Sequence, residues 1–72
     1  MSERRVSYNK LWKLLIDRNI SQTDFRKLTD ISFNTMTKLR NREFVSLPIL
    51  LKLCNHLDCD ISDICEFVRD ES

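Results

Sequence analysis

One local pattern recurs along the whole chain: an apolar residue, then Ser or Asp, and a second apolar residue four positions after that Ser or Asp. The hydroxyl or carboxylate can accept a hydrogen bond from a free N–H group in the first turn of a helix, while the two apolar side chains pack across that turn. The five copies are Val6-Ser7 with Leu11, Ile20-Ser21 with Phe25, Ile31-Ser32 with Met36, Val45-Ser46 with Leu50, and Cys59-Asp60 with Ile64. The sequence therefore predicts five helix starts.

Apolar residues follow each start at spacings of three and four, which is typical of helices with one buried face. They are Tyr8, Leu11, Leu14 and Leu15, then Phe25 and Leu28, then Met36 and Leu39, then Leu47, Leu50, Cys54 and Leu57, and finally Ile61, Ile64, Cys65 and Val68. Pro48 falls in the first turn of the fourth segment, where a missing N–H costs nothing. We expect an all-α fold, a compact bundle of five short helices.

The second and third predicted helices are joined by only a few residues, 29–32. A connection of this length is typical of a helix-turn-helix. The 72 residues are enough for one domain, so we expect a single domain over residues 1–72, with a flexible basic arm at residues 1–5 and an acidic tail at residues 70–72.

The composition argues against catalysis and against a membrane span. The chain has no glycine, so a phosphate-cradling loop or a nucleophile elbow is not available, and it has a single histidine. We therefore expect that the protein is not an enzyme. The chain also has no long apolar run, from which we expect a soluble, cytoplasmic protein. The odd number of cysteines, three, predicts reduced thiols.

The net charge of +1 conceals a division of the chain. Residues 1–44 hold ten Lys and Arg against five Asp and Glu, whereas residues 45–72 hold two against six. Such a division indicates one side that faces a polyanion and one side that repels it.

The third predicted helix has an outward face that could contact DNA bases. Opposite Met36 and Leu39 lie Asn34, Thr37, Lys38 and Asn41, which all form hydrogen bonds and include no acid. Asn pairs with adenine and Lys donates to guanine, whereas the flanking Arg40 and Arg42 suit phosphates. An ordinary solvated helix face is the alternative interpretation.

Two further residues fit the same surface. Gln22 opens the second predicted helix, where free N–H groups and a side-chain amide favour a phosphate, although a plain surface Gln is the alternative. Phe33 lies at the edge of the predicted core, so we expect it to be partly buried, with contact to a thymine methyl as the alternative.

Taken together, these motifs resemble the Cro/C1-type (XRE family) helix-turn-helix transcriptional regulators, in particular the short stand-alone bacterial members. The resemblance rests on Ser7-Tyr8-Asn9-Lys10-Leu11-Trp12, Ser21-Gln22-Thr23-Asp24-Phe25, Ile31-Ser32-Phe33-Asn34-Thr35-Met36 and Leu57-Asp58-Cys59-Asp60-Ile61-Ser62-Asp63-Ile64. It implies a lambda-repressor-like domain that places its third helix in the major groove. By position it implies base contacts from Phe33, Asn34, Thr37 and Lys38, and phosphate contacts from Gln22, Arg40, Asn41 and Arg42.

The chain departs from the family pattern at three positions. Arg26 replaces a small residue, and we expect it to point outward with its stem packed along the motif. Asp30 replaces the Gly of the turn, where Asp tolerates a left-handed conformation better than most residues. The usual Gly after the third helix is also absent, and we expect Asn41 to be the left-handed residue there.

Cys54, His56, Cys59 and Cys65 follow the spacing C-x-H-x2-C-x5-C, which matches no structural zinc signature. We expect structural thiols and neither a metal nor another cofactor, with a redox or metal sensor as the alternative.

Several apolar residues remain after the core is assigned. Trp12 and Ile16 form a second apolar stripe on the first predicted helix, and Phe67 lies off the apolar face of the last one. These three residues are therefore candidates for a homodimer interface. Two copies would set their third helices about 34 Å apart, which suits a palindromic double-stranded DNA operator.

We therefore expect a sequence-specific DNA-binding transcriptional regulator, a repressor rather than an activator, with no evident small-molecule effector. The rival hypothesis is a protein-interaction module, such as an antitoxin or antirepressor, that uses the Trp12 and Ile16 face.

Overall fold

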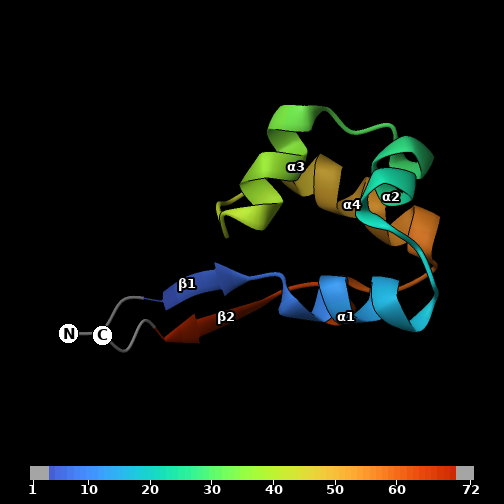
Figure 1. Cartoon of the computed structure of the whole chain (residues 1–72). Coiled ribbons are helices and arrows are strands. Elements are labelled where there is room, and N and C mark those ends of the chain that lie inside the picture. Colours follow the sequence, from blue (N-terminus) through green and yellow to red (C-terminus); the bar gives the residue numbers. More distant parts are fainter. Residues whose placement is uncertain (1–3, 70–72) are drawn as a thin grey trace.

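The computed structural model describes residues 4–69. In chain order the elements are strand β1 (Arg4–Ser7), helices α1 (Asn9–Asp17), α2 (Gln22–Thr29), α3 (Phe33–Arg40) and α4 (Leu47–Leu57), the 3-10 helix η1 (Ile61–Asp63) and strand β2 (Glu66–Arg69). In Figure 1 the hairpin of β1 and β2 leads into α1, and α2, α3 and α4 stack over α1 and the inner end of the hairpin. The predicted helical, helix-turn-helix fold is confirmed, but the prediction of five helices is wrong.

The predicted N-caps are confirmed at α2 and α3, the two helices of the helix-turn-helix. Ser21 and Ser32 precede α2 and α3 in extended conformations, and their hydroxyls accept hydrogen bonds from the N–H groups of Asp24 and Thr35. Ser46 takes the same position before α4 without a side-chain bond. These residues fix where α2, α3 and α4 begin.

The first copy of the capping pattern does not supply the N-cap of α1, and the last copy opens only a short 3-10 helix. Val6 and Ser7 lie in β1 and Tyr8 takes the N-cap position, so α1 begins one residue later than predicted. Asp60 opens only the three residues of η1. Residues 66–69 form β2 instead of continuing a fifth helix. Phe67 and Val68 favour a strand, and the antiparallel partner that stabilises it lies at the other end of the chain.

The hairpin pairs Arg4 with Arg69, Arg5 with Val68, Val6 with Phe67 and Ser7 with Glu66. Two residues of the expected flexible arm, Arg4 and Arg5, thus lie in an ordered strand. Residues 1–3 of that arm, and the expected acidic tail at 70–72, lie outside the described residues.

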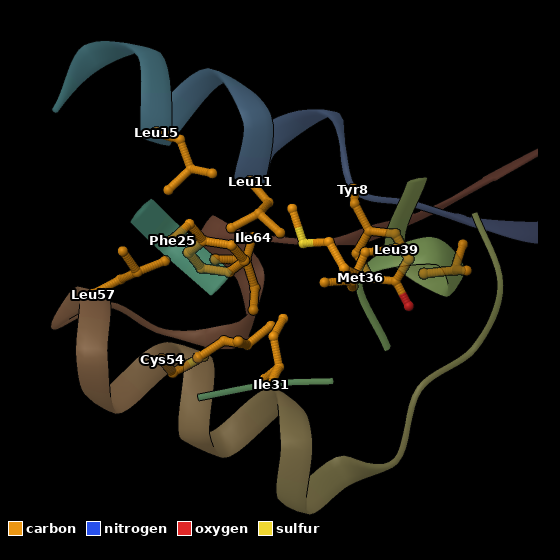
Figure 2. Packing of buried hydrophobic residues seen from close by; sticks show 12 residues of the cluster. Tyr8, Leu11, Leu15, Phe25, Ile31, Met36, Leu39, Cys54, Leu57 and Ile64 are labelled. Atoms are coloured by element: carbon orange, nitrogen blue, oxygen red, sulfur yellow. The ribbon is translucent and has the colours of Figure 1, made fainter. Parts of the chain in front are cut away.

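One apolar core joins α1, the helix-turn-helix and α4. Figure 2 shows its side chains between α1 and α4, with contributions from α2 and α3. Its members are Val6, Tyr8, Leu11, Leu15, Phe25, Ile31, Met36, Leu39, Leu53, Cys54, Leu57 and Ile64. Leu28, Leu47 and Ile61, which the periodicity placed on buried faces, are exposed. None of the helices within residues 4–69 is long and apolar enough to cross a membrane.

Each of the four α-helices is followed by a residue with a left-handed backbone, and none of these residues is glycine: Asn19, Asp30, Arg42 and Asp58, with φ between 52° and 60°. Asn and Asp are the residue types that tolerate this conformation best after glycine. The prediction for Asp30 is confirmed. The prediction for Asn41 is wrong, because its φ is −88° and the left-handed residue is Arg42.

Candidate nucleic-acid interface

Helix α3 has one buried side and one open side. Met36 and Leu39 are almost completely buried, which fixes how α3 lies on the core. The opposite side presents Phe33, Asn34, Thr37 and Lys38, all exposed. Because its buried side fixes α3 on the core, the exposed side can contact a ligand without a rearrangement of the fold.

The turn between α2 and α3 is held by backbone and side-chain contacts. Asp30 adopts the left-handed conformation and donates its N–H to the Lys27 carbonyl at 3.3 Å. Its own carbonyl accepts a hydrogen bond of 3.4 Å from Lys52 Nζ in α4. The Thr29 hydroxyl, fully buried, donates to the Phe25 carbonyl at 2.7 Å. These contacts close the end of α2 and join the turn to α4 in the absence of the usual glycine.

Two of the expected phosphate-contacting residues touch each other. Arg40 Nε donates to Gln22 Oε1 at 2.9 Å, which joins the last residue of α3 to the first residue of α2. This bond uses one of the five guanidinium donors, so the others stay available for a phosphate. The sequence predicted the same role for both residues but not their contact.

The Phe33 ring stands at the surface and contacts Arg26. The Arg26 guanidinium carbon lies 4.0 Å from the ring centroid, and Phe33 is 71% exposed. The prediction that Phe33 is partly buried is wrong, because the ring packs on the guanidinium of α2 instead of entering the core. Arg26 is half-buried, with its charged end on this outer surface, as expected.

The end of α3 is closed by two backbone hydrogen bonds. The Glu43 N–H donates to the Lys38 carbonyl at 2.9 Å, and the Arg42 N–H donates to the Leu39 carbonyl at 3.4 Å. This pair of bonds is the Schellman motif, which requires a left-handed residue at the position of Arg42. Asn41 and Arg42 are both exposed there.

A groove separates the end of α3 from β1. It has a volume of about 420 Å³, and Arg4, Arg5, Lys38 and Arg42 line it together with Val6, Glu43 and Phe44. We call it the basic groove. The sequence did not predict it, because Arg4 and Arg5 were assigned to a flexible arm. The one local signal for the hairpin is the strand preference of Phe67 and Val68 in Glu66-Phe67-Val68-Arg69.

The model of the Cro/C1-type helix-turn-helix DNA-binding domain family matches residues 10–70. The chain belongs to this family. A crystal structure of the transcriptional regulator VanUg superposes on it with a TM-score of 0.92 and is 46% identical, covering 97% of this chain and 93% of that chain. A comparison with curated proteins found no match.

The dimer candidates do not form one surface of this Cro/C1-type domain. Trp12 is half-buried against the core, whereas Ile16 and Phe67 are 73% and 63% exposed. Phe67 lies in the hairpin, whereas Ile16 lies in the last turn of α1, the end of that helix that is away from the hairpin (Figure 1). A third apolar surface, an open groove of about 510 Å³ between α4 and η1, includes Leu47, Leu51 and Ile61.

The three cysteines of the domain are free thiols. Burial raises the pKa of Cys54 to about 11, and burial is also the main cause of the raised pKa of Cys59 and Cys65. These thiols stay protonated at neutral pH. Within residues 4–69 no three His, Cys, Asp or Glu side chains are placed to hold a metal ion.

Proposed function

We propose that this Cro/C1-type domain is a bacterial, cytoplasmic transcriptional regulator that recognises a specific DNA sequence by inserting α3 into the major groove, and that it acts as a repressor. The observation that carries the proposal is the division of α3, whose Met36 and Leu39 are buried while its exposed side bears amide, hydroxyl and ammonium groups and no carboxylate. The similarity to the transcriptional regulator VanUg supports it.

In this proposal Asn34, Thr37 and Lys38 form hydrogen bonds with base edges, and Phe33 contacts a thymine methyl group. Asn pairs with adenine through two bonds, and Lys donates to guanine O6 and N7. The 71% exposure of the Phe33 ring leaves most of its surface available for an apolar contact. The phosphate-contacting residues are Gln22 and Arg40, which already touch, together with Asn41 and Arg42.

We also propose that the regulator binds a palindromic operator as a homodimer. One domain covers a small area of DNA, and a second copy extends the contact along the duplex. The groove between α4 and η1 is the stronger candidate for the dimer face, because it gathers Leu47, Leu51 and Ile61 on one surface whereas Ile16 and Phe67 lie apart. Sedimentation of Leu51→Lys against Ile16→Lys distinguishes the two faces, since only the true one yields monomers.

Selection of bound duplexes from a random pool tests the central proposal. We expect one sequence motif to be enriched at physiological salt, arranged as two inverted half-sites. Transcription in vitro from a promoter carrying that motif should then fall as the protein is added. A pool that stays random after several rounds would overturn the proposal, and salt-insensitive capture of a protein by wild type but not by Ile16→Lys would favour the interaction module.

A further inference from the structure

The basic groove is held in shape by contacts between segments that are distant in sequence. The Tyr8 hydroxyl, next to β1, donates to the Glu43 carbonyl at 2.7 Å. The centroids of the Phe44 and Phe67 rings lie 6.3 Å apart, which adds a contact between β2 and the segment after α3. Val6, Ser7 and Tyr8 are buried. The two walls of the groove are thus fixed relative to α3.

Three of the four cations that line the groove are not neutralised by contacts within residues 4–69. Among residues 4–69, the side chains of Arg4, Lys38 and Arg42 form no hydrogen bond and no ion pair. Glu43 is the one carboxylate among the lining residues, and it forms no ion pair with them. Across the hairpin Arg4 pairs with Arg69, and like charges in directly opposed positions are unfavourable. A bound anion would relieve this repulsion.

Arg42 itself occupies a position that the backbone makes unfavourable for it. The other helices place Asn or Asp at the corresponding left-handed position, whereas α3 has Arg. An unfavourable backbone conformation at a residue indicates a functional role for its side chain. Its guanidinium can bind a phosphate through two parallel hydrogen bonds.

We propose that the basic groove binds phosphate groups of the DNA backbone outside the base pairs that α3 contacts, with Arg4 and Arg42 as the guanidinium donors. Lys38 belongs both to the exposed side of α3 and to the groove, so the two surfaces are continuous. The hairpin thereby becomes a second DNA-contacting element. This inference rests on the proposed function, because the phosphates are those of the same bound duplex.

The test compares wild type with the double variant Arg4→Gln, Arg42→Gln on two duplexes, one limited to the selected motif and one extended by several base pairs on each side. Lys13→Gln is the matched control, because it removes one positive charge from α1, outside the groove. Circular dichroism checks that each variant is folded. The single variant Arg42→Gly removes the guanidinium and at the same time relieves the backbone strain at this left-handed position.

For wild type we expect the extended duplex to bind more tightly than the short one. The double variant should not show this difference. Its affinity for the extended duplex should fall about tenfold for each phosphate that it no longer binds at about 0.1 M salt, and the salt slope should decrease by roughly 0.9 for each such phosphate. Arg42→Gly should bind one phosphate fewer than wild type although its backbone strain is relieved. The preference for the motif over a mismatched sequence should stay unchanged in all variants.

The failures are distinguishable. If wild type selects no motif, the proposed function falls and this inference falls with it. If wild type binds its motif but the folded double variant keeps the same affinity and salt slope as Lys13→Gln, the basic groove has no role and the phosphate contact proposed for Arg42 falls with it. Recognition of the motif by α3 then still stands.

Discussion

The Tyr8 hydroxyl donates a hydrogen bond to the backbone carbonyl of Glu43 across 35 residues of sequence, and so ties the start of α1 to the segment that follows α3. Tyr8→Phe removes the bond and keeps the ring in the core. We expect the free energy of unfolding to fall by about 1 kcal/mol, because the carbonyl is left without its partner. Urea denaturation measures the change, and an unaltered midpoint would show that the bond contributes nothing.

The contact between Gln22 and Arg40 predicts an unusual response to substitution. Gln22→Glu places a carboxylate beside the guanidinium and at a helix N-terminus, so stability should stay equal or rise by up to about 1 kcal/mol. DNA binding should fall, because the new carboxylate repels the phosphate that Gln22 is proposed to contact. Gln22→Ala is the control, and its decrease in affinity in fluorescence anisotropy should be the smaller of the two.

Asn34 should affect specificity without affecting stability. Asn34→Ala is expected to lower affinity for the selected motif by about 1 to 3 kcal/mol while binding to random DNA stays nearly unchanged. Arg42→Ala should weaken binding to both kinds of DNA alike and reduce the salt slope by roughly one unit. Equal decreases on motif and random DNA for Asn34→Ala would contradict its base-reading role.

The stacked pair of Arg26 and Phe33 lends itself to a double-mutant cycle. Exposed cation–π pairs contribute about 0.5 to 1 kcal/mol, so Arg26→Ala, Phe33→Ala and the double variant should show a coupling of this size in unfolding experiments. On DNA, Phe33→Ala should reduce affinity where the motif contains thymine and much less where uracil, which lacks the methyl group, replaces that thymine. Additive effects on stability would mean that the contact is not formed in solution.

Alkaline pH should destabilise the fold through its buried thiols. Burial raises the pKa of Cys54 from 9.0 to about 11, so the unfolded chain releases this proton first. The stabilising effect is fully present below pH 9 and is lost as pH rises toward 11, amounting to about 3 kcal/mol at most. Unfolding in urea under reducing conditions at pH 8 and 10.5 should show the decrease. Cys54→Ala should reduce it, whereas Tyr8, Cys59 and Cys65, whose pKa values are also raised, supply the remainder.

The sequence predicted the helix-turn-helix because its signals are local. Ser21 and Ser32 cap helices through bonds to residues three positions away, and Met36 and Leu39 mark a buried face within eight residues. The family resemblance drawn from these motifs is confirmed. Of the expected contact residues on α3, Asn34, Thr37 and Lys38 could be placed on an exposed face from periodicity, whereas Phe33 could not.

The hairpin could not be predicted in the same way, because its signal is not local. Arg4 and Arg69 belong to strands that stabilise each other from opposite ends of the chain, and each four-residue strand alone is compatible with an arm or a helix. The position of Arg42 was missed for a different reason. Residue preference favoured Asn41 as the left-handed residue, but the bonds to the Lys38 and Leu39 carbonyls place that conformation one residue later.

The pairing of Arg4 with Arg69 also determines how the molecule responds to mechanical force. The outer ends of β1 and β2 lie side by side, so tension applied through the two ends of the described chain acts across the ladder and opens its hydrogen bonds one after another. Because the hydrogen bonds break one at a time, the hairpin opens at low force. The pairs of Arg4 with Arg69 and Arg5 with Val68 would open first, and the core would come under load only when the opening reaches Val6.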